Sequence, residues 1–202
     1  MNAMDASAVI QASLAASKEA KDAFAAQSAD KLIELAELIA KTFRSGGKLL
    51  IFGNGGSAAD AQHMAAEFVN RFLINRAPLP AIALTTDTSI ITAVSNDFSY
   101  DLIFVKQVQA LGKSGDLALG ISTSGTSANV VEALAAAKEM GLTTAALSGG
   151  LSIPSQGVAQ HCDLLLNVPS KSTPRIQEAH LWIEHLLCEL VETMLFGGNR
   201  QD

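Results

Sequence analysis

The sequence predicts an α/β protein, a three-layer, doubly wound sandwich in which a five-stranded parallel sheet follows a pair of N-terminal helices. Short apolar runs without polar alternation are typical of strands buried on both faces. These runs alternate with segments of helical periodicity, which favours a parallel sheet with right-handed crossovers. Hydrophobic residues make up 49% of the 202 residues and charged residues 17%, so we expect a single domain, residues 1–202, with a large core.

Two helices are expected before the first strand. The segment 6–24 is rich in alanine with few apolar points, and the segment 29–43 has apolar residues at helical spacing before Ser45-Gly46-Gly47. Since no strand separates the two helices, they should pack across a neighbouring subunit or along one side of the sheet. We expect residues 1–45 to contribute oligomer contacts and residues 48–195 to form the α/β core.

The core is expected to contain five strands with helices between them. The apolar runs predict strands at residues 49–52, 80–84, 117–121, 143–147 and 163–168. Helices are expected after residue 57 and at residues 90–94, 100–111, 128–140 and 174–195, where Pro174 suits a first helical turn. The loops that follow the strands should then lie along one edge of the sheet, where ligands bind in such folds.

A glycine turn follows the first strand and opens a helix with polar side chains on one face. Gly53-Asn54-Gly55-Gly56 permits positive φ and a close approach to the backbone, and Ser57 is a favoured N-cap. On the helix, His63, Glu67 and Arg71 are spaced four residues apart and share a face. The stretch predicts one wall of an active site, although a tight turn with a surface His–Glu pair explains it equally well.

A hydroxyl-rich loop follows the third strand. Residues 122–127, Ser-Thr-Ser-Gly-Thr-Ser, hold five hydroxyl side chains and one glycine between a strand and a helix. Backbone N–H groups at a helix N-terminus attract an anion, and hydroxyls add donors. The loop has no lysine, so it is not a nucleoside-triphosphate loop, and a sugar phosphate suits it better. If the loop only capped the following helix, one hydroxyl would be enough, whereas the loop has five.

The C-terminal helix carries further polar candidates. His180 and Glu184 share one face, and Gln177 and His185 lie eight residues apart, which is about 12 Å along a regular helix. A single histidine on such a helix is more often packed than catalytic. Spacing alone therefore makes His185 a weak candidate.

Composition excludes several classes of protein. The net charge is −6 and no basic stripe is present, so we expect no nucleic-acid partner. No signal peptide is evident and no apolar run has membrane-spanning length, so we expect no membrane partner either. Cys162 and Cys188 form no disulfide framework, which favours a reducing, cytoplasmic setting.

Four motifs stand out in the chain: Gly53-Asn54-Gly55-Gly56-Ser57, Ser95-Asn96-Asp97-Phe98, the run 120–130, and Arg175-Ile176-Gln177-Glu178-Ala179-His180. Together they resemble the sugar isomerase (SIS) domain and, more narrowly, the phosphoheptose isomerases, also called sedoheptulose 7-phosphate isomerases. The resemblance covers roughly residues 48–192. Ala66, Ser95 and Thr126 depart from the residues usual in the family, as does the segment 149–160, but no departure removes a ligand or a catalytic group.

The resemblance implies a cytoplasmic homotetramer with active sites at subunit interfaces and one zinc ion per subunit. It implies interconversion of sedoheptulose 7-phosphate and D-glycero-D-manno-heptose 7-phosphate, a step toward bacterial lipopolysaccharide. By position, the resemblance makes Glu67 and His185 catalytic and gives zinc the ligands His63, Glu67, Gln177 and His185. The residues that it implies at the sugar phosphate are Asn54, Gly55, Ser57, Arg71, Asn96, Asp97, Ser122, Thr123, Ser124, Ser127 and Gln177.

The implied chemistry is aldose–ketose isomerisation, which needs a base to move a proton between C1 and C2 and an acid to serve the oxygens. Glu67 would be the base and His185 the acid. Gln177 and His185 could reach one zinc only by stretching over Leu181. Either Gln177 lies in a distorted first turn after Pro174, or the ligands come from more than one subunit. We expect a shared site.

Two alternatives remain open at the level of the sequence. A close relative of the isomerases binds the bacterial replication initiator and is not catalytic. That relative lacks the counterparts of Glu67 and His185, and because both residues are present in this chain, the enzyme is favoured. An isomerase of another phosphosugar, such as arabinose 5-phosphate, is the second alternative. The longer members of that type carry a regulatory tail for which this chain has no length.

Overall fold

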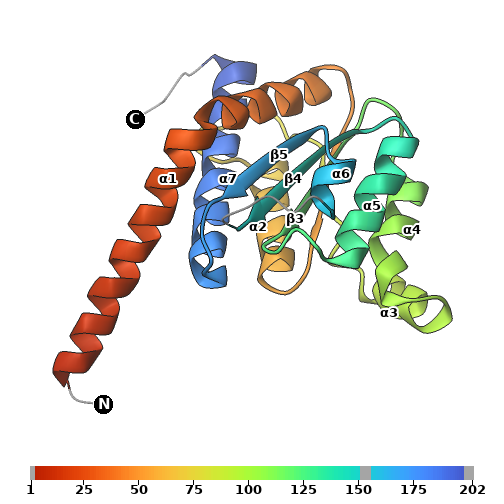
Figure 1. Cartoon of the computed structure of the whole chain (residues 1–202). Helices are drawn as coiled ribbons and strands as arrows, with labels where there is room; N and C mark the ends of the chain where they lie inside the picture. Colours follow the sequence, from red (N-terminus) through yellow and green to blue (C-terminus); the bar gives the residue numbers. More distant parts are fainter. Residues whose placement is uncertain (1–2, 151–155, 198–202) are drawn as a thin grey trace.

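A five-stranded, all-parallel sheet lies between two layers of helices in the computed structural model, which describes residues 3–150 and 156–197 (Figure 1). The strand order is β2-β1-β3-β4-β5. The predicted fold class and all five predicted strands are confirmed. The strands are β1 (Leu49–Gly53), β2 (Ala81–Ala83), β3 (Leu117–Ser122), β4 (Thr143–Gly149) and β5 (Leu164–Val168).

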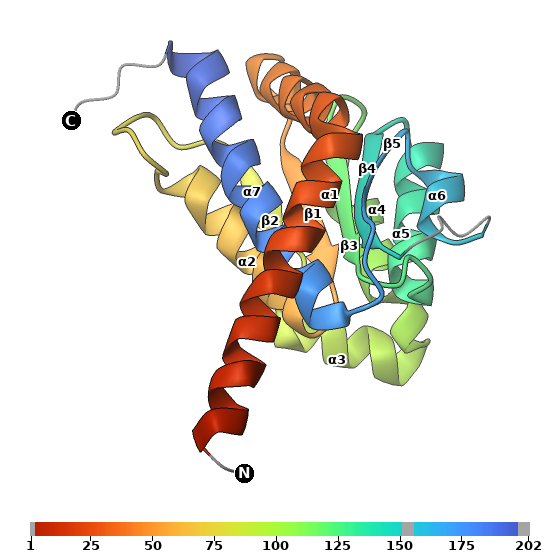
Figure 2. The ribbon, with the colours of Figure 1, turned by 60° about the vertical axis from the view of Figure 1, so that its left-hand side comes forward.

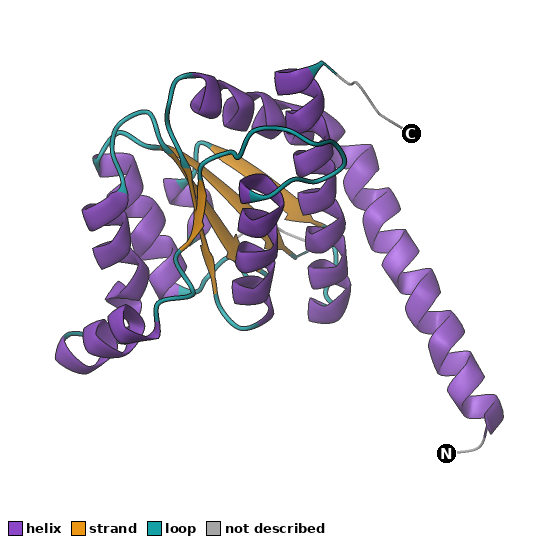
Figure 3. Cartoon of the chain, turned by 180° about the vertical axis from the view of Figure 1, so that it is seen from behind, coloured by secondary structure: helices purple, strands orange, loops and turns teal. Residues whose placement is uncertain are grey.

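The two faces of the sheet bury separate apolar clusters. Figure 3 shows from behind that the strands lie between helices. Because side chains alternate along a strand, Leu49 and Ile51 of β1 point to one cluster and Leu50 and Phe52 to the other. The first face is covered by α1 (Ala3–Arg44), α2 (Gly56–Val69) and α7 (Thr173–Phe196), and the second by α4 (Ile103–Leu111), α5 (Ala128–Glu139) and α6 (Val158–His161).

The N-terminal segment is one continuous helix, α1, so the predicted pair of helices is wrong. The residues between the two expected helices, 25–28, are Ala-Ala-Gln-Ser, which contain no glycine or proline to end a helix. The C-terminal half of α1 packs against α7 and β5, while its N-terminal end extends away from the sheet (Figures 1 and 2). Tertiary packing of that half stabilises the long helix.

The sheet order reverses at β1, because the chain passes from β1 to β2 on one side and then crosses to β3 on the other. Gly53 pairs with Ile121 in the ladder, so the turn after β1 and the loop after β3 begin side by side. This is the switch point at which ligands bind in doubly wound folds. The expectation that these loops share one edge is confirmed.

Three local predictions need correction. Gly55, with φ +57°, is the N-cap of α2, whereas Ser57 lies buried inside the first turn. A glycine at this cap adopts a backbone conformation that serine adopts only with strain. The helix expected at residues 90–94 is longer, α3 (Thr88–Asp97), and a 3₁₀ turn (Tyr100–Leu102) precedes α4. In the unusual segment 149–160, residues 151–155 lie outside the described residues, and α6 was not expected.

Within residues 3–150 and 156–197, no helix is both long and apolar enough to cross a membrane.

Candidate active site

Two helices on the same face of the sheet carry the candidate catalytic side chains. Gly56 of α2 faces Gln177 of α7, and further along the same helices His63 faces His185. The two helices therefore run side by side in the same direction. This arrangement brings the His–Glu face of α2 against α7, where the sequence alone left it either in a site or on the surface.

An imidazole pair lies between these helices. Nε2 of His63 is 2.8 Å from Nε2 of His185, and Glu67 Oε1 is 3.8 Å from the same His63 nitrogen. One ring must donate its N–H while the other accepts. The side chains of His63 and Glu67 are 40% and 24% exposed, so a small ligand can reach them. Three of the four zinc ligands that the resemblance implies therefore lie close together within one chain.

The fourth, Gln177, lies elsewhere. A Cβ built on Gly56 would meet Gln177 Nε2 at 2.4 Å, so the amide lies against the first residue of α2. His63 is seven residues further on, about 10 Å along the helix axis. Helix α7 is continuous from Thr173 onward, so the structure does not show the distorted first turn that was one of the two possible explanations for the spacing of Gln177 and His185.

Two carboxyl groups lie near the imidazole pair: the half-buried Asp60, one turn before His63 on α2, and the buried Glu184, directly before His185 on α7. Burial raises the pKa of Asp60 to about 6, although the charge of His63 acts in the opposite direction. Burial, and then the charge of Asp60, raise the pKa of Glu184 well above its ordinary value. Glu184 is fully buried, and neither of its oxygens has a hydrogen-bond partner. Spacing pointed to the face that His180 and Glu184 share, but not to Asp60 opposite it.

The hydroxyl-rich loop has the form expected of an anion site. Gly125 has φ +69°, and Ser122 Oγ lies 2.9 Å from Ser127 Oγ. Ser127 is the N-cap residue of α5 but makes no side-chain cap hydrogen bond. Ser124 is exposed, with Oγ 3.0 Å from Thr126 Oγ1, and Thr123 is half-buried. The hydroxyl of Ser127 therefore does not cap the N-terminus of α5.

Asn54 connects the glycine turn to this loop. Its amide exchanges two hydrogen bonds with the amide of Asn129, at 2.8 and 2.9 Å, and accepts a third from the hydroxyl of Tyr100 at 3.0 Å. Sequence reasoning missed Asn129 and Tyr100. Asn129 stands inside a motif that was recognised, but nothing local in the sequence indicates that Tyr100 reaches the turn.

The remaining four candidates occupy exposed positions. Arg71 and Gly55 are exposed, Arg71 just beyond α2 and Gly55 in the turn. Asn96 and Asp97, at the end of α3, are exposed and hydrogen-bond to each other at 2.8 Å. The candidates thus form two main groups in one chain, the imidazole pair with Glu67 and the loop edge with Gln177.

A zinc ion is only partly accommodated by these side chains. Among the described residues, no cluster of three or more His, Cys, Asp and Glu side chains has the spacing to hold a metal ion. Two imidazole nitrogens and a carboxylate do form a donor set that zinc accepts. With tetrahedral zinc–nitrogen bonds, the two Nε2 atoms would lie about 3.3 Å apart, so the pair needs only a small opening.

The chain is similar to known proteins along nearly its whole length. Residues 14–149 match the family model described as the SIS domain. The phosphoheptose isomerase of Roseiflexus sp. (strain RS-1) is 55% identical over 169 residues, covering 83% of this chain and 84% of the relative. That of Geobacter sulfurreducens is 51% identical over 187 residues, covering 93% and 97%.

Solved structures agree with this assignment. A phosphoheptose isomerase from Neisseria gonorrhoeae is 43% identical with a TM-score of 0.85, covering 93% of this chain and 98% of the other. One from Francisella tularensis is 36% identical with a TM-score of 0.87, covering 96% and 100%. On these matches, this chain belongs to the SIS-domain family and, within it, to the phosphoheptose isomerases.

Proposed function

We propose that the chain is an aldose–ketose isomerase that interconverts sedoheptulose 7-phosphate and D-glycero-D-manno-heptose 7-phosphate. The observation that carries the proposal is the close approach of His63, Glu67 and His185 in a chain of the phosphoheptose isomerase family. An imidazole and a carboxylate on one partly exposed wall are the acid and base that such a proton transfer requires.

The reaction moves one proton between neighbouring carbons. Glu67 takes a proton from C1 of the ketose while His185 gives a proton to the C2 carbonyl oxygen, which forms an enediol. Glu67 then returns its proton to C2, and His185 takes the proton from the C1 hydroxyl, which yields the aldehyde. The substrate phosphate binds the hydroxyls and helix N-terminus of loop 122–127, with Asn54, Ser57, Asn96, Asp97 and Arg71 on the sugar.

Zinc, one ion per subunit, completes the proposed site. His63, Glu67 and His185 would hold it, with Gln177 as the fourth ligand. Bound zinc supplies Lewis-acid stabilisation of negative charge on the sugar oxygens. The separation of Gln177 from the imidazole pair in one chain supports a site that is shared between subunits.

The proposed assembly is a cytoplasmic homotetramer in which each chain, residues 1–202, forms one SIS domain and serves lipopolysaccharide precursor synthesis. Val9, Ile10 and Leu14 on α1 are 60%, 63% and 65% exposed, and this end of the helix extends from the sheet (Figure 2). A partner subunit would cover them. Leu14→Glu should lower the assembly state in sedimentation velocity, with Glu37→Gln as a control on the same helix, and an unchanged tetramer would place the interface elsewhere.

Neither alternative function is favoured by the comparisons, which match phosphoheptose isomerases. The direct test is an assay of the purified chain with sedoheptulose 7-phosphate, with and without a chelator. Turnover that the chelator abolishes and added zinc restores supports both the reaction and the metal. Turnover that is indifferent to the chelator removes zinc from the proposal, and no turnover with zinc present removes the reaction.

A further inference from the structure

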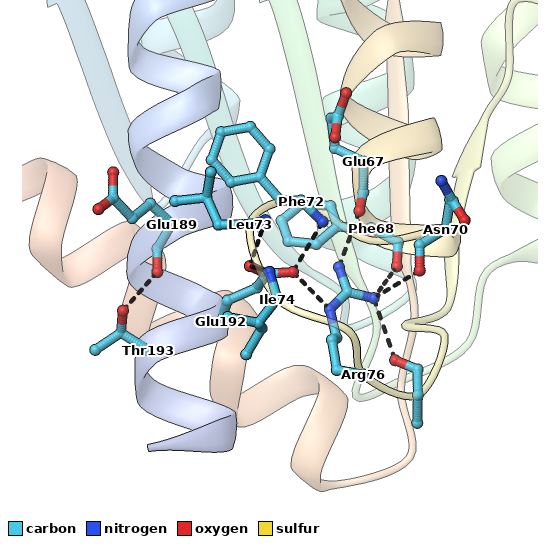
Figure 4. A network of polar contacts seen from close by, with 11 residues as sticks. Glu67, Phe68, Asn70, Phe72, Leu73, Ile74, Arg76, Glu189, Glu192 and Thr193 are labelled. Carbon is cyan, nitrogen blue, oxygen red and sulfur yellow. Dashed lines mark hydrogen bonds and ion pairs between the residues drawn. The ribbon is translucent and has the colours of Figure 1, made fainter. Parts of the chain in front are cut away.

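A buried ion pair outside the proposed reaction joins the loop after α2 to helix α7. Arg76 Nε donates to Glu192 Oε1 at 2.9 Å, and the two side chains are only 1% and 3% exposed. The same carboxylate accepts the backbone N–H groups of Phe72, Leu73 and Ile74 (Figure 4). With four donors the carboxylate is well satisfied, as a buried charge must be.

Arg76 also binds the end of the helix that carries His63 and Glu67. Its Nη1 donates to the carbonyl oxygens of Phe68 and Ala77 at 2.6 and 3.1 Å, and its Nη2 to that of Glu67 at 2.9 Å. The last carbonyls of a helix lack intrahelical partners, and a cation there meets the negative end of the helix dipole. One guanidinium therefore fixes the C-terminus of α2 to α7.

The backbone that this ion pair holds presents Phe72 to His185. The two rings stack with centroids 5.5 Å apart and planes inclined by 24°. His63 contacts the same imidazole at Nε2, at 2.8 Å. The stack constrains the plane of the His185 ring and the contact with His63 constrains its nitrogen, so the ring cannot rotate without losing one of them.

We propose that Phe72 is a positioning residue for His185, and that the Arg76–Glu192 ion pair acts through it by fixing the loop backbone. The ring of Phe72 keeps Nε2 of His185 directed at the space that it shares with Glu67. Catalytic groups displaced by about 1 Å can lose up to roughly a hundredfold in rate. The effect on turnover rests on the proposed isomerase function, whereas the geometry does not.

The kinetic test replaces the aromatic ring and leaves the ion pair intact. Phe72→Leu keeps the backbone N–H that Glu192 accepts, and we expect kcat for sedoheptulose 7-phosphate to fall roughly ten- to hundredfold with KM within about twofold. Phe72→Tyr keeps the ring and should restore kcat. Wild-type kcat in Phe72→Leu, or no rescue in Phe72→Tyr, overturns the proposal.

A second test needs no activity. The stacked ring shifts the His185 ring C–H resonances, so Phe72→Leu should move them. Glu192→Gln should move them in the same direction and make the amides of Phe72, Leu73 and Ile74 exchange at least about tenfold faster. Glu132→Gln, an exposed change on α5, is the matched control and should alter neither.

The two tests separate the geometry from the function. If the His185 resonances stay at their wild-type positions in Phe72→Leu and Glu192→Gln, the positioning role is overturned whatever the activity. If they shift as expected while the wild-type chain turns over no heptose phosphate, the proposed function fails and the positioning stands. If Glu192→Gln fails to fold, the His185 resonances in Phe72→Leu, in which the ion pair is intact, are sufficient to test the positioning role.

Discussion

His63 and His185 are separated by 122 positions in the chain, yet their Nε2 atoms lie 2.8 Å apart. Helices α2 and α7 bring them together on one face of the sheet, with Glu67 one turn along α2. A neutral imidazole donates through one nitrogen and accepts through the other, so one ring of the pair carries a proton at Nε2 and the other accepts it there. The arrangement leads to the following predictions.

The first prediction concerns the base. Glu67→Gln keeps the shape of a partly exposed side chain, so the fold should be retained while kcat falls by about 10²–10⁴-fold, as for a lost general base. Steady-state kinetics with sedoheptulose 7-phosphate measure the loss. Glu37→Gln, exposed on α1, is the control, and near wild-type turnover in Glu67→Gln would sink the assignment.

The second prediction concerns the hydroxyl-rich loop. Ser124→Ala and Ser127→Ala each remove a donor, and a hydrogen bond to a charged group contributes roughly 1.5–3 kcal/mol. Binding of the sugar phosphate should weaken about tenfold or more in each, by isothermal titration calorimetry. Ser7→Ala on the exposed part of α1 should bind normally. Unchanged affinity in both loop variants would mean that the loop does not bind the phosphate.

The third prediction compares two neighbouring glycines. A Cβ at Gly56 would meet Gln177 Nε2 at 2.4 Å, so Gly56→Ala should displace that amide and lower kcat/KM with little change in Tm. Gly55 has φ +57° but open space around it, so Gly55→Ala should lower stability by about 1 kcal/mol. Equal effects of the two variants on activity would argue against a role for Gln177.

The fourth prediction concerns pH. His180 donates from Nε2 to the carbonyl oxygen of Ser148 at 3.0 Å, and burial lowers its pKa from 6.5 to about 4. The unfolded chain therefore takes up a proton at His180 before the folded chain does. The stability that this neutral histidine contributes is complete above pH 6.5 and is lost as the pH falls toward 4, by up to about 3 kcal/mol.

The comparison that isolates this effect is with His180→Gln, whose amide can donate to the same carbonyl but does not titrate. Urea unfolding at pH 7.5, 5.5 and 4.0 gives the difference in free energy of unfolding between the wild type and the variant. That difference should shift in favour of the variant as the pH falls. A difference that is constant over this range would mean that His180 titrates normally in the folded protein.

Local sequence patterns predicted much of the fold. The strands could be predicted because each contains a short apolar run, and β1 and β3 are buried at every position. The hydroxyl-rich loop could also be predicted, since its glycine and hydroxyls are consecutive residues between a strand and a helix. The pattern gave a wrong prediction at α1, which was expected to be two helices. The apolar periodicity fades around residues 25–28, although no residue there ends a helix.

The amino-acid sequence by itself determined the βα order and the identity of the acid–base candidates, because these depend on short-range periodicity and on motifs. Only the tertiary structure decided which candidates meet. Arg76 reaches Glu192 across 116 positions, and Phe72 stacks on His185 although neither residue signals the other locally. Such contacts depend on how two helices pack against one sheet, a distance in space that spacing along the chain does not encode.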